Sequence, residues 1–132
     1  MLDVARDLQR PDAFRLVASL RIRSAQEGGR SRPIGSGYRP NCWFGQRIDG
    51  EPMYNDCAVY LRLGGEVYEG PDELLWVPPG GRCVADVQPM FARLVRPFVH
   101  VGSRFTLCEG HRVVADAEVQ RVLDPGPELD LD

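Results

Sequence analysis

Phe14-Arg15-Leu16-Val17-Ala18-Ser19-Leu20-Arg21-Ile22, followed by the turn Gln26-Glu27-Gly28-Gly29-Arg30, is the stretch that decides the fold. Its apolar and polar residues alternate with a period of two, which is typical of a half-buried β-strand. One face carries Phe14, Leu16, Ala18, Leu20 and Ile22, and the other carries Arg15, Ser19, Arg21 and Arg23. The Gly-Gly pair then predicts a sharp turn.

Short strand signals, separated by glycine and proline turns, fill the rest of the chain. No segment has ten or more residues of sustained helical periodicity. Gly64-Gly65 is a two-residue hairpin signal, Pro78-Pro79-Gly80-Gly81 is a strong turn, and Gly110-His111 joins the last two strands. We predict strands at 41–44, 57–63, 66–68, 74–77, from 82 onward, 104–109 and 113–122.

These strands predict an all-β chain, folded as a single antiparallel β-barrel of about six main strands with an inserted hairpin. The length of 132 residues suits one domain. We expect the barrel over 13–123, after a lead-in segment at 1–12 and before an acidic tail at 124–132 that is expected to be disordered.

The composition narrows the possible functions. Hydrophobic residues make up 43% of the chain and the net charge is -3, as in ordinary soluble globular proteins. No run approaches the roughly 20 apolar residues of a membrane span, and the first residues lack the core of a signal peptide. We therefore expect a cytoplasmic protein without a membrane partner. The acidic balance also argues against DNA, because non-specific nucleic-acid affinity needs positive charge.

Arginine supplies all 16 basic residues, and lysine is absent. A P-loop needs a lysine for its phosphates, so this chain is not a GTPase by itself. Schiff-base chemistry is excluded for the same reason. Arginine favours planar, bidentate contacts to phosphate or carboxylate groups.

The four cysteines, Cys42, Cys57, Cys83 and Cys108, are scattered without a C-x-x-C pair. We predict buried free thiols, no metal site and no cofactor. Asp86 and Asp116, on the polar faces of their strands, are predicted to be solvated or paired with arginines.

Catalysis is the function that the sequence favours least. His111 lies at a predicted turn close to Glu109 and Cys108, which suggests a catalytic pair. Successive side chains of a strand point to opposite faces, however, so Cys108 and Glu109 should diverge. We expect no catalytic activity.

Five short motifs follow one another along the chain: Glu27-Gly28-Gly29-Arg30, Gly37-Tyr38-Arg39-Pro40, Pro79-Gly80, Gly102-Ser103-Arg104-Phe105 and Glu109-Gly110-His111-Arg112. In this order they resemble the third, C-terminal domain of elongation factor Tu, over roughly Phe14 to Leu123. That family is a β-barrel that binds tRNA and its own GTPase domain. The segment 46–76 is longer than its counterpart, as if a hairpin centred on Gly64-Gly65 had been added.

The resemblance implies a stand-alone, translation-related binding module without GTPase activity. It places Arg30, Ser31, Arg39, Asn41, Glu109 and Gly110 at the surface that faces the T-stem of tRNA. Arg32 adds a phosphate donor beside them. Ser31 and Asn41 are shorter than the family's residues, which weakens that contact set. We refer to these seven residues as the predicted RNA face.

Other readings stay open. Arg30 and Arg39 can instead pair with internal carboxylates, or stack on Tyr38 and Trp43, and so fix the turns. Aromatic residues are typical of protein interfaces, and the candidates here are Trp43, Trp76 and Tyr68. A free barrel can then act as a decoy or immunity-type regulator that meets a GTPase domain, an exchange factor or a toxin. A third reading is a dimerisation module.

Overall fold

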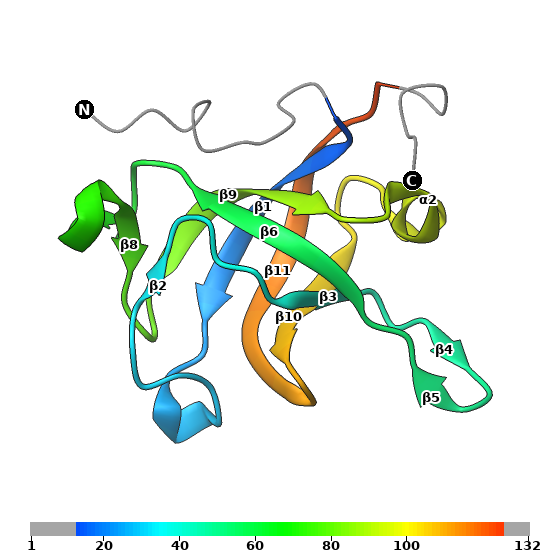
Figure 1. Cartoon of the computed structure of the whole chain (residues 1–132), viewed down its shortest axis with the longest axis horizontal. Coiled ribbons are helices and arrows are strands. Elements are labelled where there is room, and N and C mark those ends of the chain that lie inside the picture. Colours follow the sequence, from blue (N-terminus) through cyan, green and yellow to red (C-terminus); the bar gives the residue numbers. More distant parts are fainter. Residues whose placement is uncertain (1–12, 126–132) are drawn as a thin grey trace.

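The structure is a computed structural model that describes residues 13–125 (Figure 1). The predicted lead-in at 1–12, and the acidic tail from residue 126 onward, lie outside the described residues. Those two predictions therefore stay predictions.

Six strands form a closed antiparallel barrel, which confirms the predicted fold class. Every neighbouring pair in it is antiparallel. The first and last strands of the chain lie side by side at its centre in Figure 1 and close the barrel. In spatial order the strands are β1 (Arg15–Ile22), β11 (Arg112–Leu123), β10 (Arg104–Glu109), β3 (Asn41–Trp43), β6 (Asn55–Leu61) and β9 (Arg82–Pro89).

Alternation along each strand fills the barrel interior. On β1 the inward set Leu16, Ala18, Leu20 and Ile22 is buried, as the sequence pattern predicts. A register shift between Val17 and Ala18 marks a bulge against β11. Such a bulge increases the local twist, which helps a sheet to close. The interior is a packed apolar core to which all six strands contribute.

Smaller elements surround the barrel. A three-stranded sheet, at the left in Figure 1, joins β2 (Ile34–Gly35), β8 (Leu75–Val77) and β7 (Tyr68–Glu69). Within 13–125, no helix is long and apolar enough to cross a membrane. The short helices are η1 (Ala25–Glu27), η2 (Pro71–Glu73), α2 (Ala92–Val95) and η3 (Arg96–Phe98).

The inserted segment does hold a hairpin, but its turn is at Asp49-Gly50. It joins β4 (Arg47–Ile48) to β5 (Glu51–Pro52) and lies at the right in Figure 1. Asp49 and Gly50 both have positive φ, 53° and 83°, and Asp-Gly favours the two-residue hairpin turn that requires this.

The predicted hairpin centred on Gly64-Gly65 is wrong. The chain leaves β6 at Leu61, and the returning strand β7 pairs with β8. The backbone N–H of Glu66 donates to the Arg82 carbonyl at 3.2 Å, which draws the loop toward the start of β9. Contact with β9 therefore replaces the pairing with β6 that the two glycines suggest.

Four cysteines, Cys42, Cys57, Cys83 and Cys108, are buried and carry free thiols, as predicted. In the described part of the chain, no group of three or more His, Cys, Asp or Glu side chains could hold a metal ion.

Candidate nucleic-acid interface

One carboxylate organises the end of the barrel where β10 turns into β11. Glu109 ends β10, and its cross-strand partner across the Gly110-His111 turn is Arg112. One Glu109 oxygen accepts hydrogen bonds from the Arg30 guanidinium and the Tyr38 hydroxyl. The other accepts from Arg112 Nη2 at 2.8 Å. We call Arg30, Tyr38, Glu109 and Arg112 the Glu109 cluster.

Arg30 reaches this cluster because the turn after β1 is tightly closed. Gly28 has a φ of 85° at the end of η1, a conformation that favours glycine. The Gly29 N–H donates to the Ser24 carbonyl at 2.8 Å, and the Arg30 N–H donates to the Arg23 carbonyl at 3.3 Å. The η1 turn and the β10–β11 turn lie at the same, lower end of the molecule in Figure 1.

The Arg30 guanidinium also stacks on an aromatic ring. Its central carbon lies 5.3 Å from the centroid of Tyr38, within the range of a cation–π contact. Its Nε donates to the Arg32 carbonyl at 3.3 Å. The reading in which Arg30 pairs with an internal carboxylate and stacks on Tyr38 is therefore confirmed.

The cluster shifts the pKa of its members. Partial burial alone would raise the pKa of Glu109, but hydrogen bonds from Tyr38 and Arg30 outweigh it and lower that pKa. Burial, and then the Glu109 carboxylate, raises the pKa of Tyr38. Burial works to lower the pKa of Arg30, yet its bond to Glu109 leaves it raised. At neutral pH the cluster thus holds a carboxylate, a neutral phenol and cationic guanidinium groups.

The remaining residues of the predicted RNA face lie around the cluster. Ser31, Arg32 and Arg39 are exposed, and no ion pair of either arginine occurs within residues 13–125. Arg39 therefore does not share the internal pairing of Arg30. Asn41 is half-buried at the start of β3, opposite Cys108 of β10 and Asp56 of β6.

The turn itself adds backbone groups to this surface. Gly110 is exposed, with a φ of 60°, directly after Glu109. Cys108 is buried with its Sγ 3.5 Å from Thr106 Oγ1, whereas the half-buried Glu109 carboxylate contacts Arg30, Tyr38 and Arg112, so these two side chains diverge as predicted. Of the predicted set, the structure brings Arg30 and Glu109 into direct contact.

Sequence reasoning named Tyr38 as a stacking partner but missed the bond from its hydroxyl to Glu109. It did not single out Arg112, and it missed the contact between Tyr54 and His111. The Tyr54 hydroxyl lies 3.2 Å from His111 Nδ1, and their rings meet edge to face at 5.8 Å. Tyr54 is 57 positions from His111, so no local pattern could have revealed the contact.

The aromatic candidates for a protein interface have partners within the chain. Trp43 is half-buried, lies 5.9 Å from Tyr54, and donates its indole N–H to the Gln46 carbonyl at 2.8 Å. Trp76 is half-buried and donates to the Pro71 carbonyl at 2.9 Å. Its cross-strand neighbour Tyr68 is exposed. Trp43 in β3 and Trp76 in β8 thus each hold a neighbouring connecting segment through the indole N–H.

The outward aspartates pair with arginines. Asp86 is almost fully buried and accepts two hydrogen bonds from Arg62, each 2.7 Å long. Asp116 accepts two from Arg23, at 2.9 and 2.8 Å. The bond from Arg23 lowers the pKa of Asp116 despite partial burial. The alternative of arginine pairing is confirmed for both aspartates.

A search of protein-family models finds none that matches this chain. The geometry therefore carries the functional argument. Arg30 and Arg112 contact Glu109 at this end, Arg32 and Arg39 follow Arg30 and Tyr38 closely in the chain, and Asp56 lies opposite Asn41. The local excess is positive, although the net charge of the chain is -3. Such a surface can bind phosphate and hydroxyl groups.

Proposed function

We propose that this chain is a non-catalytic, cytoplasmic RNA-binding barrel, similar to the third domain of elongation factor Tu and able to bind the stem of a tRNA. One observation carries the proposal. Arg32 and Arg39 are exposed, without ion pairs in residues 13–125, beside an Arg30 guanidinium that Glu109 and Tyr38 hold in place. Free and oriented guanidinium groups at one end of a barrel suit a phosphate backbone.

Each part of the surface has a different role in this proposal. Arg32 and Arg39 contact phosphates, because their guanidinium groups are available for bidentate hydrogen bonds. Asn41 and Ser31 supply the amide and hydroxyl groups that contact ribose 2′-hydroxyls. Arg30 is held by Glu109 and Tyr38, which reduces the entropy that its side chain loses on binding.

The first prediction tests the phosphate contacts. We expect labelled tRNA to bind with an affinity that falls steeply with salt, because binding releases counterions. Arg39→Gln should weaken binding by about 1 kcal/mol and make the salt slope shallower by about one phosphate contact. Fluorescence anisotropy titrations at several salt concentrations measure both quantities.

Arg121→Gln is the matched control, because Arg121 is an exposed arginine near the far end of β11. It removes the same charge without touching the predicted RNA face. Equal tRNA affinities of the Arg39 and Arg121 variants would mean that binding depends only on the net charge of the protein, which would contradict the proposal. Failure of the wild-type protein to bind tRNA at low salt would contradict it outright.

A second candidate function is protein binding, as for a decoy or regulator of a GTPase domain, exchange factor or toxin. One observation favours it. The connection between β9 and β10 exposes five large apolar side chains: Met90, Phe91, Leu94, Phe98 and Val101. Exposed apolar residues in one segment are typical of interaction sites. A partner captured in high salt after ribonuclease treatment, and lost with Leu94→Gln, would favour this function over RNA binding.

A further inference from the structure

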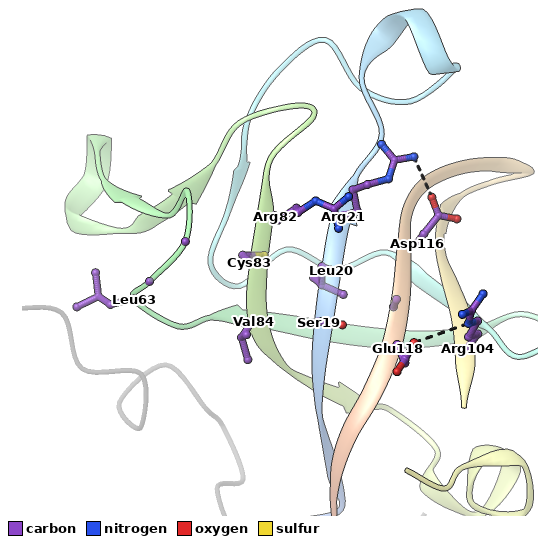
Figure 2. Close-up of a pocket in the computed structure, with 13 residues that line it drawn as sticks. Ser19, Leu20, Arg21, Leu63, Arg82, Cys83, Val84, Arg104, Asp116 and Glu118 are labelled. Carbon is purple, nitrogen blue, oxygen red and sulfur yellow. Dashed lines mark hydrogen bonds and ion pairs between the residues drawn. The ribbon is translucent and has the colours of Figure 1, made fainter. Parts of the chain in front are cut away.

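A groove runs over the outer surface of the barrel, away from the Glu109 cluster. It has a volume of about 540 Å³ and crosses β9, β1 and β11 to reach β10 (Figure 2). Leu63, on the loop after β6, stands at one side, and Arg104 of β10 stands at the other. We call this feature the arginine groove.

The strand register explains which side chains line it. Arg82 of β9 lies opposite Arg21 of β1, and Arg21 lies opposite Asp116 of β11. Two residues further along, Ser19 lies opposite Glu118, and Glu118 lies opposite Arg104. Because side chains alternate between faces, these two rows point outward together. Because the side chain of Ser19 is small, it fills little of the middle of the arginine groove.

Two of the three arginines in the groove are available to a ligand. Arg21 is held by Glu27, to which it donates two hydrogen bonds of 3.0 and 2.8 Å. Arg82 is exposed, and its guanidinium has no ion pair in residues 13–125. Arg104 lies a loose 3.7 Å from Glu118, and its side chain is 86% exposed.

The carboxylates between these two cations select the ligand. Asp116 and Glu118 lie on β11, between Arg82 on one side and Arg104 on the other. Asp116 is already paired with Arg23, but Glu118 is exposed, and an RNA backbone with a negative charge at every nucleotide would meet it. A ligand with two separated negative charges and a neutral or positive group between them avoids that repulsion.

We propose that the arginine groove binds an extended peptide with acidic residues at positions i and i+4 and a neutral or basic residue at i+2. Arg82 and Arg104 are three interstrand spacings apart, about 14 Å, and two residues apart along the strands, about 7 Å. Their backbones are therefore separated by about 16 Å on the diagonal, a distance whose excess over about 14 Å the long arginine side chains can span. Residues i and i+4 of an extended chain lie about 14 Å apart and point to the same side. Their carboxylates then meet Arg82 and Arg104, while residue i+2 lies over β11 and faces Glu118.

Two further features support a peptide. The exposed Leu63 offers an apolar surface for the stem of the first acidic side chain. A second hollow of about 450 Å³ shares Arg21, Arg104, Asp116 and Ala117 with the arginine groove. It continues toward Trp43 and Phe44, so the surface can accept a chain longer than five residues. This inference does not depend on RNA binding at the other site.

The second prediction is tested with three fluorescein-labelled, amidated pentapeptides. The first is Glu-Ala-Lys-Ala-Glu, the second replaces both Glu by Gln, and the third, Glu-Ala-Lys-Glu-Ala, moves one Glu to the opposite side of the chain. We expect the first peptide to bind about three- to ten-fold more tightly than either of the others in anisotropy titrations, because each exposed ion pair contributes modestly.

Variants connect this binding to the groove. Arg82→Gln and Arg104→Gln should each weaken the first peptide by about three-fold, and together by about ten-fold. Arg121→Gln and Arg39→Gln, outside the groove, should leave it unchanged. Thermal melts followed by circular dichroism check that each variant is folded. Arg39→Gln thereby separates a failure of this inference from a failure of the proposed function.

Three results would overturn the inference. The first is equal binding of the three peptides, and the second is wild-type affinity in the double variant Arg82→Gln/Arg104→Gln. The third is displacement of the peptide by a short single-stranded RNA that itself loses affinity in that double variant, which would make the groove an RNA site.

Discussion

Glu109 is a single side chain that holds three other side chains at this end of the barrel. Its two oxygens accept from Arg30, Tyr38 and Arg112, which come from different parts of the chain. Its side chain is 26% exposed, so these charge-assisted bonds are partly shielded from water. Removing the charge would loosen Arg30 and the β10–β11 turn together.

The third prediction concerns Glu109→Gln, which should lower the free energy of unfolding by about 1–2 kcal/mol near neutral pH. Its folded pKa is lowered from 4.5. The ionised group therefore contributes stability that is present above about pH 4.5 and is lost as the pH falls through the lowered value. The difference in stability between wild type and variant should shrink on acidification.

Urea unfolding of both proteins between about pH 6 and pH 3 measures this effect. Ser31→Ala, at an exposed neighbouring position, is the control and should show no pH-dependent difference. A constant gap between wild type and Glu109→Gln over the whole range would mean that the carboxylate charge is not what stabilises the cluster.

At the residue scale, the sequence predicted the partners of charged side chains more readily than the partners of aromatic side chains. The pairing of Asp86 and Asp116 with arginines follows from outward positions on strands rich in arginine. Tyr38 reaches the Glu109 cluster from a loop whose backbone is bonded to Val59 of β6. That bonding is tertiary, so a local pattern does not contain it.

At the scale of elements, the turn after β1 determines where Arg30 lies. η1 spans only three residues, yet it has a reciprocal cap in which the Ser24 backbone N–H donates to the Glu27 carboxylate at 3.0 Å. Hydrogen bonding from Arg21, and then from Ser24, lowers the pKa of Glu27 to about 2. Gly29 closes the turn against β1 so tightly that it has no room for a side chain.

The fourth prediction is that Gly29→Ala destabilises the barrel by about 1–3 kcal/mol and also weakens tRNA binding. A Cβ atom at this position would lie 2.3 Å from the carbonyl oxygen of Arg23, which is backbone and cannot rotate away. The turn must then open and move Arg30. Denaturant unfolding and the anisotropy titration described above measure the two effects.

Gln26→Ala provides the comparison, because Gln26 is exposed in the same turn. It should change neither quantity appreciably. A Gly29→Ala protein with wild-type stability would show that the turn can relax without cost and that its tightness does not position Arg30.

Strands with strong alternation were predictable from the sequence, and so were the short strands β3 and β8, whereas the two-residue strands β2, β4 and β5 were not. β1, β9, β10 and β11 follow their predicted positions because each buries an alternating apolar face. The two glycine-containing turns of the inserted segment were ambiguous: Asp49-Gly50 forms the hairpin, while Gly64-Gly65 does not. The residues of a turn limit the backbone conformations that it can adopt. They do not determine which strand the chain pairs with next, and for the segment after Gly64-Gly65 the contact with β9 determines this.

At the scale of the whole molecule, closure depends on the two ends of the described chain. β1 and β11 are the first and last strands and pair over eight residue pairs, from Arg15 with Leu123 to Ile22 with Ala115. No barrel exists until this pairing forms, and it joins segments about a hundred residues apart. The entropy of closing such a loop must be overcome before the contacts can compensate for it.

The fifth prediction is that the chain refolds in about milliseconds to seconds, in the range of all-β domains with non-local pairing. Its 11 prolines should add a slower phase of tens of seconds, from isomers that form in the unfolded chain. Stopped-flow tryptophan fluorescence measures both phases. Refolding after only brief unfolding should suppress the slower one. A main phase in the microsecond range would contradict the dependence on β1–β11 closure.

The buried cysteines make the unfolded chain more sensitive to oxidants than the native barrel. Burial raises the pKa of Cys83 to about 12, and a hydrogen bond with Cys42, together with burial, raises the pKa of Cys57. Thiolate is the reactive form, so the native protein resists alkylation and oxidation at these sites. An unfolded chain exposes all four thiols, which are then free to form mispaired crosslinks. Under oxidising conditions, crosslinking can therefore make unfolding irreversible. The lifetime of the folded protein is then governed by its unfolding rate.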